Sequence, residues 1–420
     1  EGSKKGTLPF FIFLSLILSI STQQTSFPMS AKQTPVVKPT YPVPKIVILI
    51  YLPIYNIKFL SIYYMTKTRK KQKMRKNKSI KKRTRIKISS KFESGNIKLK
   101  SIQESSRVIL EIKDEPNRKY RRKYQNWFYF KASNVKKKTT FIIQNIKNYD
   151  DDWKGFKVCY SYDNKNWKRL KTRVNLKEKK LEWKINPKKS TIWFAYYPPY
   201  PFSKSKKLLK NMKVIGRTKE NRPIYMGKLG HGPLKVWLIS GQHPGETINS
   251  WILEGFVKRI LERKKDLFNK YTFIIIPNAN PDGNVKGHWY VTSKGINLNR
   301  DWRDFKSPET RAIKKYLDNI GYFLVFDIHG DEGSKNHFLV GSNHPLYQVI
   351  NKQINKKNRH FQLENHYSQK YMHTMKDTLD DYTSGITIEG ATKHPLFNHK
   401  TLQEEPLSIG RSFADIFINL

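Results

Sequence analysis

Two hydrophobic patterns divide the chain near residue 200. Between residues 95 and 200, apolar and polar residues alternate, as in 156–162 and 181–185, and turn-forming residues such as those at 163–166 separate the runs. Several short alternating strands joined by regular turns indicate an all-β sandwich. The many aromatic residues of this region are interpreted as its core rather than as a platform for single-stranded nucleic acid.

A different pattern follows the proline-rich segment 198–201. Short apolar runs at 236–240, 272–276 and 322–328 alternate with segments that carry apolar residues at helical spacing, such as 248–260 and 312–320. Strands that alternate with helices predict an α/β domain with a mixed, largely parallel sheet between helices. We therefore predict a β-sandwich domain over 93–204 and an α/β domain over 205–420.

The first 92 residues fit neither domain. An apolar run at 8–20 has the length of a signal-peptide core, and Pro53, Asn56 and Lys58 interrupt a second apolar stretch at 46–65. Residues 67–91 carry 14 Lys or Arg in 25 positions and no acid. We expect 1–92 to be a disordered tail or not native. A solvated tail is the favoured interpretation of 67–91, and contact with nucleic acid or an anionic membrane is the alternative.

The charge and the cysteine count restrict the chemistry. The chain carries 81 Lys and Arg against 33 Asp and Glu, a net charge of +48. Residues 1–210 account for +39 of it and residues 211–420 for only +9. The single cysteine, Cys159, excludes an internal disulfide framework and an all-cysteine zinc site. A metal site would therefore have to use histidines and carboxylates.

Residues of that kind follow two of the predicted strands. His243 and Glu246 come directly after the run 236–240, and His329 comes directly after 323–328. In open α/β sheets, ligands bind beyond the carboxyl ends of the strands. Two histidines and one glutamate with an open fourth position are typical of catalytic zinc. The alternative is that His243 caps a helix and His329 satisfies local backbone groups.

Three further residues extend the candidate site. Asn299 and Arg300 offer an amide and a guanidinium fork that suit a carboxylate, and Glu389 ends another apolar strand. A carboxylate beside an activated water can take its proton. A surface salt bridge for Arg300 and an ordinary strand-end acid for Glu389 are the alternatives.

Five ordered motifs resemble those of the zinc carboxypeptidases, in the cytosolic carboxypeptidase subfamily. The resemblance covers about 95–420 and includes the β domain, and Asp331-Glu332 is more similar to bacterial members than to animal ones. The motifs are His243-Pro-Gly-Glu246-Thr, Asn280-Pro-Asp-Gly283, Asn297-Leu-Asn-Arg300-Asp-Trp302, Asp327-Ile-His329-Gly330 and Thr387-Ile-Glu389.

The resemblance implies a zinc metallocarboxypeptidase whose catalytic domain spans 205–420. It implies one zinc ion per chain held by His243, Glu246 and His329, with Glu389 as the general acid/base for the attacking water. It also implies that Arg300, with Asn299, binds the terminal carboxylate of a peptide or protein substrate.

One position departs from the family. The family has an arginine that polarises the scissile carbonyl where this chain has Tyr290. A tyrosine hydroxyl donates one hydrogen bond without a positive charge, and loss of one oxyanion donor typically lowers the rate about 10²–10³-fold. We therefore expect weakened or altered catalysis.

Several hypotheses follow for function and location. Acidic (Glu) tails are the expected substrates, because family members remove them and the domain is basic. The alternatives are a catalytically impaired zinc-binding protein that acts as a binding module, and an amidohydrolase of the same fold. The latter is disfavoured, since only 31 residues follow Glu389 and such enzymes place a β domain there. The expected location is cytoplasmic, and the signal-like run 8–20 leaves export as the alternative. No obligate partner is inferred.

Overall fold

A computed structural model describes residues 85–103, 106–116, 126–147, 150–341, 346–357, 361–362, 374–379, 385–393 and 400–419. These residues belong to one compact unit. The predicted apolar runs at 8–20 and 46–65, and the basic segment as far as residue 84, lie outside the described residues. Within the described ranges, no helix is long and apolar enough to cross a membrane.

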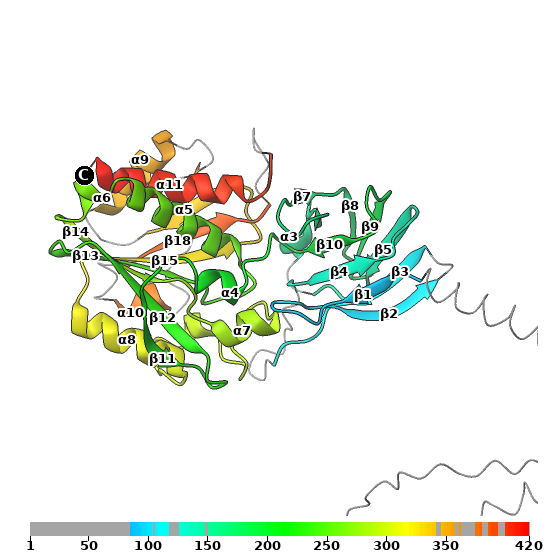
Figure 1. The fold of residues 1–420 in the computed structure, drawn as a ribbon, viewed down its shortest axis with the longest axis horizontal. Helices are drawn as coiled ribbons and strands as arrows, with labels where there is room; N and C mark the ends of the chain where they lie inside the picture. The colour runs from blue at the N-terminus through cyan, green and yellow to red at the C-terminus, as the bar shows by residue number, and fades with distance from the viewer. Residues whose placement is uncertain are drawn as a thin grey trace, which may run out of the picture. The chain divides into compact units, whose positions relative to one another are not determined.

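Two five-stranded sheets form the first domain (Figure 1). The first contains, in spatial order, β1 (Lys87–Ser89), β4 (Tyr129–Ser133), β10 (Ile192–Ala195), β6 (Cys159–Ser161) and β7 (Lys168–Arg169). The second contains β2 (Lys98–Gln103), β3 (Arg107–Glu111), β5 (Thr139–Ile143), β9 (Lys180–Ile185) and β8 (Thr172–Asn175). The pairing is antiparallel except between β3 and β5.

Aromatic side chains fill the space between the two sheets. Phe130 and Phe194 of the first sheet meet Phe141 and Trp183 of the second, with the ring centroids of Phe141 and Phe194 4.8 Å apart and those of Phe141 and Trp183 5.6 Å apart. These four side chains are at most 1% exposed. The prediction that the alternating aromatic residues form a sandwich core is confirmed.

The sandwich begins earlier than the sequence pattern indicated. β1 pairs antiparallel with β4, with Ile88 opposite Ala132, and Ile86 before it is 7% exposed. The end of the segment that we assigned to a disordered tail is therefore an edge strand. Ile86 and Ile88 are the only alternating apolar residues there, and the surrounding lysines and arginines make the segment look like a basic tail. An edge strand tolerates those charges because its outer side faces solvent.

An eight-stranded mixed sheet forms the second domain. Its strands, in spatial order, are β11 (Met212–Arg217), β12 (Pro223–Leu229), β14 (Tyr271–Ile276), β13 (Leu234–Ser240), β15 (Leu324–Asp331), β18 (Gly385–Ala391), β16 (His337–Val340) and β17 (Phe361–Gln362). The four central strands, β14, β13, β15 and β18, are parallel, and β12 and β16 pair antiparallel at their flanks. The fold class predicted from the sequence is confirmed.

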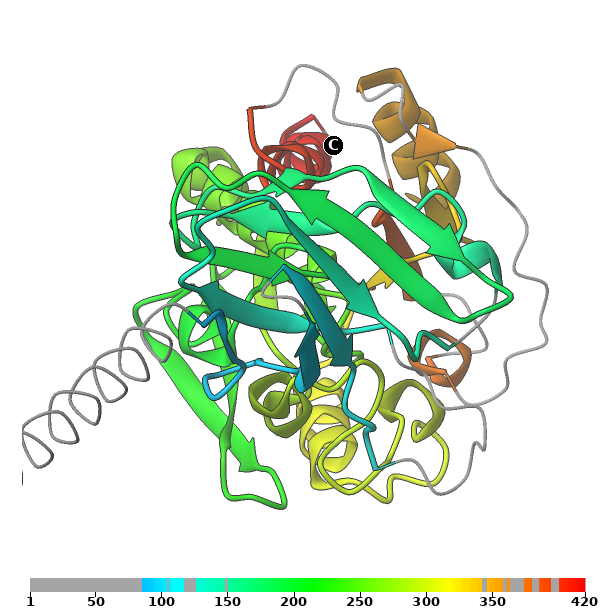
Figure 2. The ribbon, with the colours of Figure 1, turned by 90° about the vertical axis from the view of Figure 1, so that its right-hand side faces the viewer.

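Helices cover both faces of this sheet (Figures 1 and 2). α5 (Ile248–Glu262) and α11 (Glu404–Ile418) pack on one face, where Phe413 and Phe417 contact Phe326 of β15. α8 (Pro308–Ile320) packs on the other, with Ile313 and Leu317 in one apolar cluster with Trp237. The remaining helices are α3 (Asp150–Trp153), α4 (Phe202–Ser205), α6 (Lys264–Leu267), α7 (Pro281–Lys286), α9 (Leu346–Lys357), α10 (Met375–Thr378) and the 3-10 turn η1 (Leu298–Arg300).

Local sequence fixes the ends of the helices that border the site. The Asn280 side chain caps α7 by accepting the Gly283 N–H, Pro281 occupies the first turn, and the left-handed Gly287 ends the helix. Ser307 caps α8 in the same way, with Pro308 following it. The segment between the two helices therefore begins at the Gly287 cap of α7 and ends at the Ser307 cap of α8.

Candidate metal centre

Two histidines and a glutamate meet at the carboxyl ends of adjacent strands. His243 and Glu246 lie on the loop between β13 and α5, and His329 lies on the neighbouring β15. One ligand atom from each residue lies within 4.8 Å of the others. All three side chains are buried, with at most 5% of their surface exposed. Among the residues that the structure describes, this is the one His, Cys, Asp and Glu cluster that could hold a metal ion.

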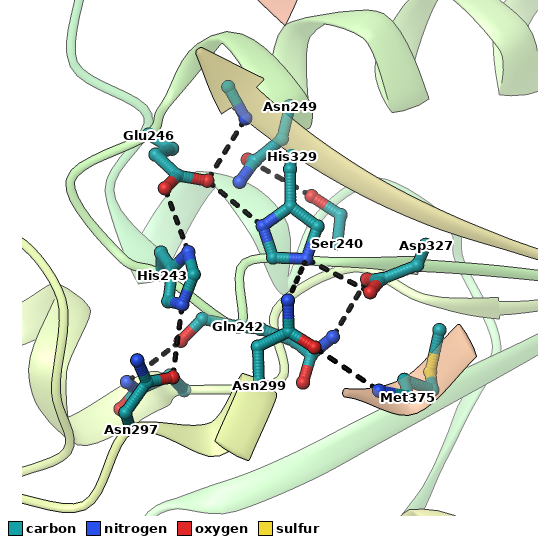
Figure 3. A network of polar contacts seen from close by, with 12 residues as sticks. Ser240, Gln242, His243, Glu246, Asn249, Asn297, Asn299, Asp327, His329 and Met375 are labelled. Carbon is teal, nitrogen blue, oxygen red and sulfur yellow. Dashed lines mark hydrogen bonds and ion pairs between the residues drawn. The ribbon is translucent and has the colours of Figure 1, made fainter. Parts of the chain in front are cut away.

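The two imidazoles point the same nitrogen at the glutamate. His243 Nδ1 lies 2.8 Å from Glu246 Oε1, and His329 Nδ1 lies 3.1 Å from Glu246 Oε2 (Figure 3). Their Nε2 atoms face other acceptors: Asn297 Oδ1 at 3.0 Å from His243, and Asp327 Oδ2 at 2.9 Å from His329. When Nε2 donates to these oxygens, Nδ1 is the nitrogen that faces the glutamate and that can bind a cation once it gives up its proton.

This donor set fits zinc. Zinc is usually bound by neutral histidines. The ring nitrogen that does not bind the metal donates its N–H to an oxygen, and this oxygen fixes the tautomer. Two nitrogens and one carboxylate around an open position match the catalytic type of site. His243, His329 and Glu246 would hold a cation, and its binding would release the protons that the two Nδ1 atoms share with the carboxylate.

Electrostatics in the cluster favour a negative carboxylate. Burial would raise the pKa of Glu246, but the imidazoles of His243 and His329 outweigh it and hold the pKa at about 2. Burial lowers the pKa of His243 despite the nearby Glu246. Burial also acts to lower the pKa of His329, but the carboxylates of Asp327 and Glu246 raise it well above its usual range.

A hydrogen-bonded chain behind His329 fixes its orientation. Asp327 Oδ1 accepts from Gln242 Nε2 at 2.7 Å, and Gln242 Oε1 accepts from Trp302 Nε1 at 2.7 Å. The indole nitrogen can only donate, so it determines which end of the Gln242 amide faces Asp327. The carboxylate of Asp327 then has one oxygen for Gln242 and the other for His329.

The backbone of β15 approaches Glu246 closely. Gly330 N donates to Glu246 Oε2 at 3.0 Å. A Cβ atom at position 330 would lie 2.6 Å from Ile248 Cγ2 and 3.1 Å from Glu246 Cβ. Only glycine allows this approach, which explains why a glycine follows the histidine of the strand.

Glu389 lies beside the cluster on β18. It pairs in register with His329, so both side chains leave their neighbouring strands on the same face. Burial raises the pKa of Glu389 well above its usual range; the carboxylates of Glu246, Asp331 and Asp327 add to that effect, while His329 opposes it. The group is thus suited to hold a proton next to the three candidate ligands.

The remaining predicted residues border the same place. Asn299 Nδ2 lies 3.3 Å from His329 Nε2, and Asn299 Oδ1 accepts from the backbone of Met375 at 3.2 Å. Arg300 Nη1 donates to the backbone oxygen of Asn299 at 2.6 Å. The ring of Tyr290 stacks on that of His243, with centroids 3.8 Å apart and planes 18° apart. The structure therefore brings all seven predicted residues to one end of the sheet.

Four residues of this environment were not predicted as functional. Asp327 and Asn297 lie inside the motifs that resemble the family. Asp327 is two residues before His329 on one strand, so its side chain is on the same face, and this spacing could have indicated that the two side chains interact. Gln242 precedes His243 directly. Glu115 accepts from the backbone of Trp289 and Tyr290, but it comes from the β-sandwich, 174 residues earlier, and no sequence pattern connects it to the site.

The chain matches known families over both domains. Residues 88–197 match the cytosolic carboxypeptidase N-terminal domain, and residues 202–395 match zinc carboxypeptidase. An uncharacterized protein of Zymomonas mobilis is 30% identical over 275 residues, which are 61% of this chain and 70% of that protein. Cytosolic carboxypeptidase 2 of Xenopus tropicalis is 26% identical over 66% of this chain, but the chain spans only 34% of its length.

The chain is also similar to solved structures over most of its length. A metallo-carboxypeptidase from Burkholderia cenocepacia superposes with a TM-score of 0.72 at 25% identity, over 80% of this chain and 98% of that one. The chain belongs to the zinc carboxypeptidases and carries the N-terminal domain described for the cytosolic carboxypeptidases. It is thereby placed among the metal-dependent peptide hydrolases.

Proposed function

We propose that this chain is a zinc-dependent carboxypeptidase that removes C-terminal residues from peptides or proteins. The convergence of His243, Glu246 and His329 at adjacent strand ends, with Glu389 in register beside them, is the observation that carries the proposal. The first three residues would hold the ion, and the tautomers set by Asn297 and Asp327 prepare them to do so.

Glu389 would move the protons of the reaction. Zinc, when bound, polarises the scissile carbonyl and lowers the pKa of the attacking water to about 7. Glu389 would take a proton from that water and deliver it to the departing amine. Its position in register with His329 supports both steps because it places the carboxyl beside the candidate ligands, and its raised pKa favours the protonated form that delivers the proton to the amine.

Arg300 would select a free C-terminus. Its guanidinium donates to the backbone of Asn299, and Asn299 is itself held by Met375, so both residues are fixed on the 3-10 turn beside His329. A fixed guanidinium and an amide can bind the two oxygens of a terminal carboxylate. Since only the last residue of a chain offers that anion, the enzyme would act as an exopeptidase.

Tyr290 would contact the substrate carbonyl in place of an arginine. Its ring is parallel to the imidazole of His243, so it lies beside the candidate ligands and carries a hydroxyl without charge. If that hydroxyl does not stabilise the carbonyl oxygen as well as an arginine would, catalysis would be weakened. If it does not stabilise that oxygen at all, the chain would be a zinc-binding module without catalysis. The net charge of +9 over residues 211–420 favours acidic C-terminal residues as substrates through long-range attraction.

Paired peptides test the role of Arg300. The zinc-loaded chain should cleave a peptide with a free C-terminal carboxylate and leave the same peptide intact when its C-terminus is amidated. In Arg300→Gln, KM for the free acid should rise about 10–100-fold, the range for loss of a hydrogen bond to a charged group. Equal cleavage of the amidated peptide by the wild-type chain would contradict the exopeptidase assignment.

A further inference from the structure

The loop over residues 287–291 supports the metal centre from outside. Gly245, between two candidate ligands in sequence, donates its N–H to the backbone oxygen of Trp289 at 2.9 Å. A Cβ atom at Gly245 would lie 2.3 Å from Cε3 and 2.8 Å from Cα of Trp289, so only glycine allows the two backbones to approach this closely. The next residue, Tyr290, stacks on His243. The position of this loop therefore determines where His243 and the peptide around Gly245 lie.

The β-sandwich holds this loop at both ends. Asn96 Nδ2 donates to the backbone oxygen of Gly287 at 2.8 Å. Glu115 Oε2 accepts from the backbone N–H groups of Trp289 at 2.8 Å and Tyr290 at 3.0 Å. Asn96 also contacts the segment that carries Glu115, since its Oδ1 accepts from the backbone N–H of Lys113 at 2.9 Å. The second domain supplies neither of these two groups.

The backbone at Gly287 shows how close the contact is. Gly287 adopts a left-handed φ of 69°, and a Cβ atom there would lie 2.7 Å from the backbone oxygen of Ser94 in the β-sandwich. Ser94 N in turn donates to the backbone oxygen of Val285 at 3.0 Å. The start of the loop is therefore in contact with the β-sandwich independently of Glu115.

The carboxylate of Glu115 is costly to bury. Its Oε1 atom is covered and has no hydrogen-bond partner among the described residues. Burial raises the pKa of Glu115 to about 7, although the backbone N–H groups of Tyr290, Trp289 and Val291 favour the charged form. A buried polar group that lacks partners destabilises the fold, so its contacts with the loop must offset that cost.

We propose that Glu115 is a positioning residue of the active site: the β-sandwich supplies its carboxylate to the 287–291 loop, which keeps Tyr290 on His243 and Trp289 against Gly245. Glu115 touches neither substrate nor metal in this role. The β-sandwich is then a working part of the catalytic unit. The role in catalysis rests on the proposed function, whereas the role in holding the metal loop can be measured without a substrate.

Three variants of the full chain test this role. Glu115→Ala removes the acceptor and leaves two N–H groups unpaired, and Glu115→Asp keeps the charge but is too short to reach both. Each should raise the zinc dissociation constant, measured by chelator competition, about tenfold, as for residues that orient metal ligands through a neighbour. Glu115→Gln keeps a carbonyl acceptor and should stay near the wild type. Asp114→Ala, at a 53% exposed side chain, is the matched control and should change nothing.

A double-mutant cycle separates positioning from a general loss of stability. Because Glu115 acts on both Tyr290 and Trp289, its removal should have a smaller effect on the zinc constant and on kcat/KM in the Tyr290→Ala background than in the wild type. Additive effects, or an unchanged zinc constant in folded Glu115→Ala or Glu115→Asp, would overturn the proposal. If the wild-type chain cleaves no peptide, the proposed function fails, and the zinc constants of the same variants still decide the role of Glu115.

Discussion

Replacing Asp327 with asparagine should damage the metal centre more than its small size change suggests. Asp327 presents one oxygen to Gln242 Nε2 at 2.7 Å and the other to His329 Nε2 at 2.9 Å. In Asp327→Asn, the amide has only one oxygen for these two contacts. Because Trp302 fixes the orientation of Gln242, the oxygen of the new amide has to face Gln242.

The amide nitrogen would then face His329. An N–H donor there favours the tautomer in which Nε2 carries the lone pair and Nδ1 carries the proton, and a protonated Nδ1 cannot bind a metal. Residues that orient metal ligands in this way typically account for 10–100-fold in affinity. That range corresponds to about 1.4–2.7 kcal/mol of zinc binding.

Zinc affinity measured by chelator competition is the assay. Asp327→Asn should weaken binding at least as much as Asp327→Ala, which removes the acceptor without offering a donor. Asp318→Asn, an exposed acid on α8 paired with Lys314, is the control and should bind as the wild type does. Wild-type affinity in Asp327→Asn would refute the assignment of the His329 tautomer.

Three further changes have defined outcomes. Tyr290→Arg should raise kcat/KM about 10²-fold if the missing charge limits the reaction, and an unchanged value would show that Tyr290 suffices. Gly330→Ala should lower the free energy of unfolding by about 1–3 kcal/mol, because its Cβ would lie 2.6 Å from Ile248; urea denaturation with no shift in midpoint would contradict the close approach. Glu309 is 1% exposed, and burial raises its pKa to about 7 in the folded chain. As the pH rises, this carboxyl ionises in the unfolded chain near pH 4.5, before it ionises in the folded chain. The free energy of unfolding therefore falls between about pH 4.5 and 7. Glu309→Gln should therefore be more stable than the wild type at pH 8, with the difference disappearing below pH 4.5, and a difference independent of pH would exclude this explanation.

The sequence was most informative where periodicity and strand ends coincide. The apolar runs 236–240 and 322–328 form the buried strands β13 and β15. Because these two strands are parallel neighbours, the residues at their carboxyl ends lie at the same edge of the sheet. The pattern thus placed His243, Glu246 and His329 at one edge of the sheet, whereas their assignment as metal ligands depended on the resemblance to the zinc carboxypeptidases.

The sequence pattern did not predict the contacts between residues far apart in the chain. β15 continues through His329 to Asp331, because pairing with β18 extends past the apolar run. β1 is a short edge strand whose composition is that of a basic tail. Glu115 reaches the 287–291 loop only because the two domains pack together, and neither periodicity nor spacing records such a contact.

Peptide trimming by the zinc-loaded full chain is the most direct measurement of the proposed activity. Peptides ending in Glu, Lys or Phe would be incubated with the wild type and with Glu389→Gln, and the products read by mass spectrometry. The wild type should release C-terminal residues one at a time, with Glu favoured, and Glu389→Gln should release none while still binding zinc. Intact peptides after incubation with zinc-bound wild-type protein, or equal trimming by Glu389→Gln, would contradict a carboxypeptidase that uses Glu389 as its acid and base.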